Sequence, residues 1–249
     1  MKNKGKISPI GIIGFGRFGR VLADVLKREF KIIVFSRPKP KNFPKNPKVN
    51  LRSLKETAGC KIVILAVPIS VFAQVIKEIN PYLKKGSLVV DVCSVKKYPV
   101  RIMEKYLPKE IEILATHPLF GPDSIKNGLN GLKIVLFPVR IKKQKYNQIK
   151  KWIRKQGLKI IEISPEEHDK LIAKTQAITH LIGRILEKMK INKTLIDTPS
   201  FQKLLEIKEV VCGDSWQFFK DIQRFNPYPK KVREDFKRAL EKIEKYVQK

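Results

Sequence analysis

The sequence predicts a doubly wound α/β domain over residues 1–164, followed by an all-helical domain over residues 165–249. Two observations carry this prediction. Short runs rich in Ile and Val alternate with helical patterns as far as Ile163, which is typical of buried, mostly parallel strands joined by helices. From Ser164-Pro165-Glu166-Glu167 onward only helical patterns follow, and this segment is itself a helix start, with a capping hydroxyl, an early proline and acidic residues.

Individual elements follow from the apolar pattern. Seven runs are too short for helices and predict strands, at Ile10–Ile13, Ile32–Phe35, Ile62–Val67, Leu88–Val92, Ile111–Ala115, Ile134–Phe137 and Lys159–Ile163. Helical patterns lie between several of them, at Phe18–Phe30, Val71–Tyr82, Val100–Tyr106 and Lys143–Gln156. In the second domain we expect one long helix to about Lys190 and then helices near Ser200–Val211, Trp216–Phe225 and Lys231–Val247. The stretch Pro38–Lys48 should be an extended loop.

Composition excludes several classes of protein. With 43% hydrophobic residues in 249, the chain is not a disordered polycation. No apolar run reaches about 18 residues, so we expect no membrane span. The three cysteines, Cys60, Cys93 and Cys212, are far apart and form neither a disulfide framework nor a metal-ligand set. We therefore expect no metal and a reducing, cytoplasmic compartment.

The net charge of +30 invites a nucleic-acid interpretation. The lysines, however, are scattered over many short segments, without an aromatic-rich basic motif or zinc-finger spacing, so nucleic acid is not the favoured partner. Five cations could attract an anionic small molecule instead, and these are Arg37, Lys39, Lys41, Lys96 and Lys126.

The segment Gly14-Phe15-Gly16-Arg17-Phe18-Gly19 fits the pattern G-x-G-x-x-G and lies between a predicted strand and a helix. In that position the glycines allow a tight turn, a close approach to a pyrophosphate and close helix–strand packing. The segment therefore predicts a Rossmann-type dinucleotide site; the alternative is a glycine turn in a domain that binds nothing. The expected cofactor-binding set is Gly14, Phe15, Gly16, Arg17, Phe18, Gly19, Ser36, Arg37, Val67 and Pro68.

The end of the second strand distinguishes between the two nicotinamide cofactors. An NAD site usually has an acidic residue there, which accepts from the ribose 2′-hydroxyl. Here Ser36-Arg37 follows the strand, and a hydroxyl with a guanidinium suits a 2′-phosphate. We therefore expect NADP, although Ser36 and Arg37 could instead simply begin a turn.

Two polar residues follow later strands, at the edge where ligands bind in such sheets. His117 lies just past the strand Ile111–Ala115, and Ser94 lies shortly after Leu88–Val92. A serine and a histidine beside a nicotinamide suggest that a substrate hydroxyl is polarised or deprotonated. A structural role for His117, or a helix cap for Ser94, remains an alternative.

The long helix of the second domain carries a polar stripe. At 100° per residue, Asp169, Gln176 and His180 share one side, which Arg184 and Glu187 continue. The stripe could line a cleft or face solvent.

These motifs resemble one family in sequence order. Gly14-Phe15-Gly16, Asp91–Lys96, Thr116–Pro122, Glu167-His168-Asp169 and Gln176–His180 together resemble the prephenate/arogenate dehydrogenases of tyrosine biosynthesis. The plant-type, NADP-dependent arogenate branch is the most similar, on three further segments, which are Phe35-Ser36-Arg37, Lys126-Asn127-Gly128 and Gly213-Asp214-Ser215.

The resemblance implies an NADP-dependent oxidative decarboxylation of arogenate to tyrosine and carbon dioxide. His117 would draw the proton of the ring hydroxyl as hydride leaves the same carbon, and Ser94 would orient this pair. Gln176 and His180 would line the substrate pocket, and Asp214 would favour the amine of arogenate, unless it is a helix cap before Trp216.

The resemblance also implies a homodimer and leaves one gap. Many bacterial members have an arginine that holds a substrate carboxylate, but Leu205–Val211 has none, so Lys126 is the substitute candidate. Three alternatives stay open: a prephenate dehydrogenase, another two-domain oxidoreductase, and a non-catalytic NADP-binding protein whose basic surface binds a polyanion.

Overall fold

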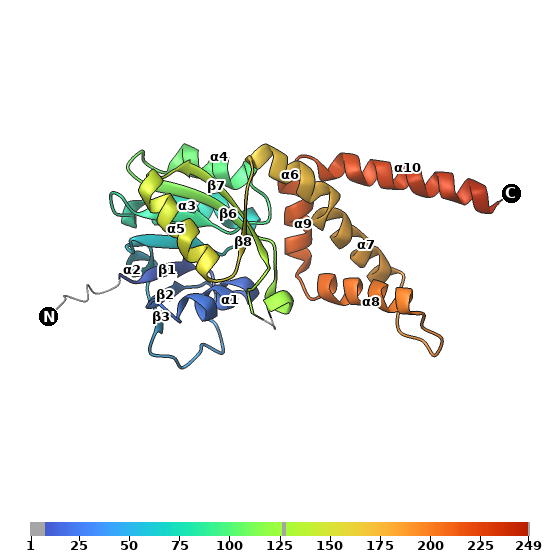
Figure 1. Cartoon of the computed structure of the whole chain (residues 1–249), viewed down its shortest axis with the longest axis horizontal. Helices are drawn as coiled ribbons and strands as arrows, with labels where there is room; N and C mark the ends of the chain where they lie inside the picture. Colours follow the sequence, from blue (N-terminus) through green and yellow to red (C-terminus); the bar gives the residue numbers. More distant parts are fainter. Residues whose placement is uncertain (1–7, 126–127, 249) are drawn as a thin grey trace. The chain divides into compact units, whose positions relative to one another are not determined.

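The computed structural model describes residues 8–125 and 128–248, which form two compact units, Met1–Ser164 and Pro165–Lys249 (Figure 1). The division falls where the sequence changes from alternating strands and helices to helices alone. Among the described residues, no helix combines the length and apolar character needed to cross a membrane.

The first unit contains one eight-stranded sheet in the order β3-β2-β1-β4-β5-β6-β7-β8. Its strands are β1 (Ile10–Ile13), β2 (Ile32–Phe35), β3 (Val49–Leu51), β4 (Ile62–Leu65), β5 (Leu88–Asp91), β6 (Glu112–Pro118), β7 (Lys133–Arg140) and β8 (Lys159–Glu162). Every neighbouring pair is parallel except β6–β7, which is antiparallel. The predicted fold class, a doubly wound α/β sheet followed by helices, is therefore confirmed.

Helices cover both faces of this sheet. They are α1 (Arg17–Leu26), α2 (Leu54–Ala58), α3 (Ile69–Ile79), α4 (Lys97–Tyr106) and α5 (Lys143–Lys155), with short 3-10 turns η1 (Asn80–Tyr82) and η2 (Pro122–Ile125). The chain steps from β1 to β2 in one direction along the sheet and from β4 to β5 and β6 in the other direction. Right-handed crossovers therefore place α1 on the opposite face from α3 and α4. Because β7 runs the other way, α5 joins α1 on its face.

Two details differ from the sequence prediction. The strand β3 and the short helix α2 were not predicted, because Val49–Leu51 is only three residues long and pairs with β2 alone. In addition, β6 continues past Ala115 to Pro118, because its last residues pair with β7, with His117 opposite Val135. His117 therefore lies within the strand and not beyond its end.

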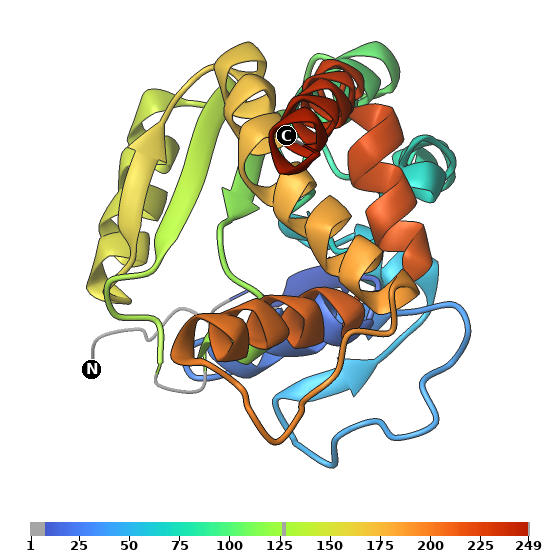
Figure 2. The same ribbon diagram turned by 90° about the vertical axis from the view of Figure 1, so that its right-hand side faces the viewer.

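The second unit contains five helices among its described residues, α6 (Pro165–Lys174), α7 (Gln176–Lys188), α8 (Pro199–Cys212), α9 (Trp216–Phe225) and α10 (Pro229–Val247). Both α8 and α9 pack against α7 (Figure 2). The approach of α8 is close, since a Cβ on Gly183 would lie 2.8 Å from the Cβ of Val211.

The prediction of one helix from Ser164 to Lys190 is wrong, because the helix breaks at Thr175. Thr175 has φ −121° and ψ −90°, outside the helical region. Its Oγ1 donates to the carbonyl of Leu171 over 2.9 Å, the acceptor that its own N–H would use in a continuous α-helix. The N–H turns instead to the carbonyl of Ile172. Asp169 therefore belongs to α6, whereas Gln176 and His180 belong to α7.

Candidate active site

Three glycines shape the turn between β1 and α1. Gly14 has a φ of +100°, and a Cβ there would lie 2.2 Å from the carbonyl oxygen of Ala66. A Cβ on Gly19 would lie 2.3 Å from the carbonyl oxygen of Gly14, whereas one on Gly16 would meet no described atom within 4 Å. Gly16 is also the N-cap of α1, with no side-chain cap bond. The positive end of this helix therefore faces space in which an anion fits.

A pocket of about 520 Å³ adjoins this turn. It brings together seven residues of the predicted cofactor set, which are Gly14, Phe15, Gly16, Ser36, Arg37, Val67 and Pro68. The other three have different surroundings. Arg17 donates from Nη2 to Oδ2 of Asp123 over 2.8 Å, Phe18 packs against Phe120, and Gly19 packs on the turn itself.

The pocket also contains two charged residues that sequence reasoning missed. The guanidinium of Arg20 lies 4.8 Å from the ring centroid of Phe15 and donates to the carbonyl of Asn42. Glu78 of α3 accepts from Nη1 of Arg37 at 3.0 Å. Arg20 directly follows the third glycine of the motif, so its position in the sequence could have identified it as a pocket residue. Nothing local marks Glu78, because only the packing of α3 brings it beside the end of β2.

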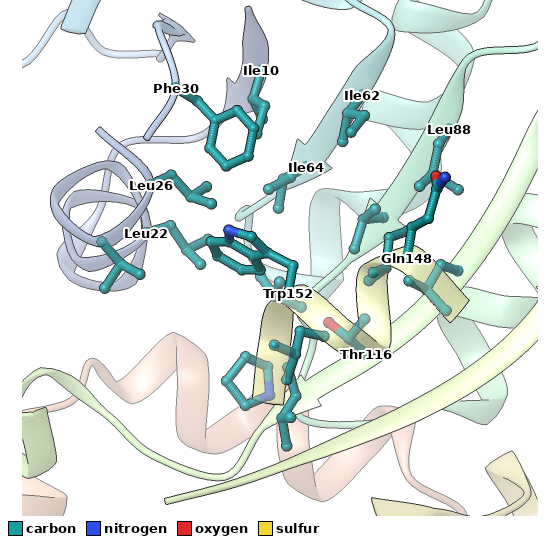
Figure 3. Close-up of a pocket in the computed structure, with 18 of the residues that line it drawn as sticks. Ile10, Leu22, Leu26, Phe30, Ile62, Ile64, Leu88, Thr116, Gln148 and Trp152 are labelled. Atoms are coloured by element: carbon teal, nitrogen blue, oxygen red, sulfur yellow. The ribbon is translucent and has the colours of Figure 1, made fainter. Parts of the chain in front are cut away.

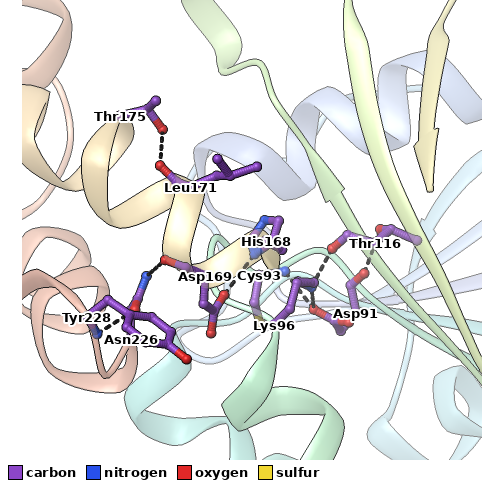
Figure 4. Close-up of polar contacts among 10 residues, drawn as sticks. All are labelled: Asp91, Cys93, Lys96, Thr116, His168, Asp169, Leu171, Thr175, Asn226 and Tyr228. Carbon is purple, nitrogen blue, oxygen red and sulfur yellow. Dashed lines mark hydrogen bonds and ion pairs between the residues drawn. The ribbon is translucent and has the colours of Figure 1, made fainter. Parts of the chain in front are cut away.

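A buried ion pair links the ends of β5 and β6. The ammonium of Lys96 donates to Oδ1 of Asp91 and, over 2.5 Å, to the carbonyl of Thr116 (Figure 4). Asp91 and Lys96 are both fully buried. Complete burial raises the pKa of the Asp91 carboxyl above its ordinary value, and the Lys96 ammonium opposes that effect. Lys96 therefore has an internal partner, which corrects the expectation that it serves mainly to attract an anionic ligand.

The same ion pair fixes the segment that carries Ser94. The N–H of Cys93 donates to Oδ1 of Asp91 over 3.0 Å, and Oγ1 of Thr116 donates to the carbonyl of Asp91 over 2.6 Å. Since Asp91 pairs with Ala115 in the parallel ladder, Ser94 and His117 lie at the same edge of the sheet. Both are buried. Ser94 does not cap a helix, because α4 begins at Lys97 with Lys96 as its N-cap.

The helical unit gathers a second set of polar side chains on α7. His180 is buried, its ring packs edge-on against Phe218, and its Nε2 lies 4.0 Å from Oδ2 of Asp214. Arg184, one turn further along and also buried, donates from Nη2 to the carbonyl of Asp214 and from Nη1 to Glu187. The polar stripe of α7 therefore does not face solvent at these positions. Asp214 is not the cap of α9, because the hydroxyl of Ser215 caps it.

Three polar atoms on this face have no hydrogen-bond partner among the described residues. They are Oε1 of Gln176, Nδ1 of His180 and Nε of Arg184, all buried and spaced one helical turn apart. A buried polar atom without a partner destabilises the fold unless a ligand or water satisfies it. The arrangement therefore suits a ligand with polar groups. The predicted substrate contact Lys126 lies outside the described residues.

A further network holds α6 to the segment before α10. Nδ1 of His168 lies 2.7 Å from Oδ1 of Asp169, and Nδ2 of Asn226 donates to the carbonyl of Asp169 over 2.8 Å (Figure 4). All three residues are buried. His168 and Asp169 thus contribute to the packing of the helical unit.

Replacing Lys96 by methionine should leave the Asp91 carboxylate buried without its counter-ion. We expect the free energy of unfolding to fall by about 3–5 kcal/mol, measured by urea denaturation. Adding Asp91→Asn to Lys96→Met should restore part of this loss, because the stranded charge is removed. Lys109→Met, at an exposed lysine, is the control and should change little. Equal stability of Lys96→Met and Lys109→Met would contradict this account.

The environment of His180 predicts a pH effect on stability. Burial, followed by the charge of Arg184, lowers its pKa from 6.5 to about 4. Between these values the unfolded chain binds a proton that the folded chain does not, so stability should fall as the pH falls. From pH 7 to pH 5 the loss should be about 2 kcal/mol, which His180→Gln should remove. Denaturation at both pH values measures it. An NMR titration that gives His180 an ordinary pKa would contradict it.

Comparisons with known proteins agree with this architecture. Residues 43–162 match the family model described as prephenate dehydrogenase, nucleotide-binding domain, and residues 185–249 match one described as TYRAAT1-like, C-terminal domain. A solved prephenate dehydrogenase from A. aeolicus, in complex with hydroxyphenyl propionate and NAD+, is 20% identical, with a TM-score of 0.73 over 98% of this chain and 92% of that one. At that identity the likeness shows the fold alone.

Two curated relatives from Arabidopsis thaliana extend the likeness to nearly the whole chain. Arogenate dehydrogenase 1, chloroplastic, is 34% identical over 97% of this chain but only 39% of its own length. Arogenate dehydrogenase 2, chloroplastic, is 32% identical over 95% of this chain and 69% of its own length. The chain therefore belongs to the prephenate/arogenate dehydrogenase family.

Proposed function

We propose that the chain catalyses the NADP-dependent oxidative decarboxylation of arogenate to tyrosine. The observation that carries the proposal is the burial of His117 at the sheet edge to which the β1–α1 glycine turn also belongs. Ligands of doubly wound sheets bind at that edge. Family membership and the likeness to arogenate dehydrogenases over nearly the whole chain support the same reaction.

The glycine-turn pocket fits a dinucleotide. The space at Gly16 and the uncapped start of α1 suit a pyrophosphate. Ser36 and Arg37 line the same pocket where an NAD site usually has an acid. The competing feature is Glu78, whose carboxylate binds Arg37. Since that ion pair is exposed, a 2′-phosphate can replace the carboxylate at the guanidinium, and we therefore favour NADP over NAD.

The bound nicotinamide would supply the hydride acceptor. His117 would hold the ring hydroxyl of the substrate and accept its proton as the carbon–hydrogen bond breaks, and the carboxylate then leaves as carbon dioxide to give the aromatic ring. Ser94 would orient His117 and the hydroxyl. The buried Lys96–Asp91 pair holds the segment that carries Ser94 and bonds the carbonyl of Thr116, directly before His117.

The polar face of α7 supports a substrate role for the helical unit. We propose that Oε1 of Gln176 and Nδ1 of His180 bind substrate, because both are buried without a partner among the described residues. Asp214 would favour arogenate over prephenate, since its carboxylate attracts the amine that only arogenate carries. Arg184 holds the Asp214 carbonyl and so positions this turn beside His180.

The reaction is tested by NADPH formation, followed by ultraviolet absorbance with arogenate and then with prephenate. We expect arogenate with NADP to give the higher kcat/KM. His117→Asn should lower kcat by about 10²- to 10⁴-fold. Ser36→Asp with Arg37→Ala should weaken NADP use by about tenfold or more, because a charge-assisted contact is lost.

Lys109→Ala, at an exposed lysine, is the control for these variants and should behave as wild type. Turnover of prephenate but not of arogenate would make prephenate the substrate. Unchanged NADP kinetics in the double variant would contradict the proposal that Ser36 and Arg37 select NADP. Steeply salt-dependent RNA binding without any turnover would favour the polyanion-binding alternative.

We also propose that the helical unit forms a homodimer. Large apolar side chains are exposed at two places. Those on α10 are Leu240, Ile243, Tyr246 and Val247, and those on the loop after α7 are Leu195 and Ile196. Exposed apolar side chains that follow one another along a single helix, as on α10, mark an interaction surface. Sedimentation equilibrium should give twice the chain mass of 28.8 kDa. Ile243→Glu should shift the equilibrium to monomer, whereas Lys242→Glu, its exposed neighbour, should not. A monomeric wild type would contradict the proposal.

A further inference from the structure

The pocket at the glycine turn has one carboxylate among its described lining residues, that of Glu78. The end of β2, where an NAD site usually has an acidic residue, has none in this sequence. The fold brings Glu78 there from α3, 41 residues away from Arg37 in the chain. The other charged side chains described in the lining are both cations, Arg20 and Arg37.

Both oxygens of the Glu78 carboxylate have a hydrogen-bond partner. Oε2 accepts from Nη1 of Arg37 over 3.0 Å, and Oε1 accepts from Nε2 of Gln74 over 2.8 Å. Gln74 lies one turn before Glu78 on α3 and lines the same pocket. The Glu78 side chain is 29% exposed, less than half the value of 63% for Arg37. The carboxylate is therefore held against the wall of the pocket, facing the guanidinium.

The position of Arg37 determines what this carboxylate does to a ligand. The guanidinium lies 5.2 Å from the ring centroid of Phe35 and next in sequence to Ser36, where a 2′-phosphate would be held. Such a phosphate monoester carries a charge of about −1.5 to −2 at neutral pH. It would bind a guanidinium that already has an anionic partner, and it would lie close to that anion. Glu78 therefore competes with the phosphate and repels it.

The same carboxylate has no such effect on NAD. That cofactor has an uncharged hydroxyl in place of the phosphate, so it does not compete for the guanidinium and the ion pair between Arg37 and Glu78 stays intact. Glu78 thus acts on one of the two cofactors and not on the other, which is the property of a residue that sets specificity.

We propose that Glu78 is a specificity-determining residue that limits the preference of this pocket for NADP over NAD. Ser36 and Arg37 favour NADP, Glu78 opposes it through Arg37, and the chain binds both cofactors. The inference rests on the proposed dinucleotide pocket, but it does not depend on the proposed reaction or its substrate.

The proposal is tested by the dissociation constants of NADP and NAD, measured by calorimetry without substrate. Glu78→Gln removes the charge and keeps the shape and the acceptor for Gln74. It should tighten NADP binding by about three- to tenfold, because the ion pair is partly exposed, and should change NAD binding by less than about twofold. The gain should shrink at high ionic strength.

Two further variants make the test specific. In an Arg37→Ala background, Glu78→Gln should change NADP binding by less than about twofold, because the competition takes place at the guanidinium. Glu104→Gln, at an exposed glutamate of α4 outside the pocket, removes the same charge and should leave both affinities unchanged.

Three results would overturn the inference while leaving the dinucleotide pocket in place. They are unchanged or weaker NADP binding in Glu78→Gln, equal tightening of NADP and NAD, and an equal gain in Glu104→Gln. Weaker NADP binding would mean that Glu78 instead holds Arg37 ready for the phosphate. If the wild type bound neither cofactor, the proposed dinucleotide pocket would fail together with this inference.

Discussion

The arrangement of the proposed active site depends on one buried ion pair. Lys96 and Asp91 are both buried in the protein interior. An isolated charge is strongly unfavourable there, so each of the two residues requires the other. The two side chains also form hydrogen bonds with backbone groups. The Asp91 carboxylate accepts from the N–H of Cys93, and the Lys96 ammonium binds the carbonyl of Thr116. A loop after β5 and the end of β6 thereby become one rigid piece. Ser94 and His117 are attached to that piece.

The sequence was a good guide where the signal is local. The glycine turn is recognisable from six consecutive residues, in which Gly14 and Gly19 leave room for nearby carbonyl oxygens and Gly16 leaves open space. The same holds for the strand runs and for the Ser-Pro-Glu-Glu helix start at Ser164, which the structure bears out with α6 from Pro165. These features are specified by residues that lie next to one another, so their pattern could be interpreted without the fold.

Features set by distant contacts could not be predicted in this way. Lys96 resembled any other surface lysine until the fold brought Asp91 and Thr116 around it. The extension of β6 through His117 depends on β7, and the break at Thr175 depends on a side-chain hydroxyl that competes with the backbone. Arg184 was noticed only as part of a stripe, yet it is a buried cation that holds the Asp214 turn. Periodicity alone does not distinguish a buried polar face from a solvated one.

The side chains along β6 alternate between the two faces of the sheet. Thr116 and Pro118 line a cavity between the sheet and helices α1 and α5 (Figure 3), so His117 between them points to the opposite face of the sheet. The Thr116 hydroxyl binds the Asp91 carbonyl and its own carbonyl binds Lys96. The Lys96–Asp91 network therefore includes a residue, Thr116, whose neighbours along β6 serve both faces of the sheet. Part of the +30 charge has a local position, because Arg37 lines the pocket at the glycine turn.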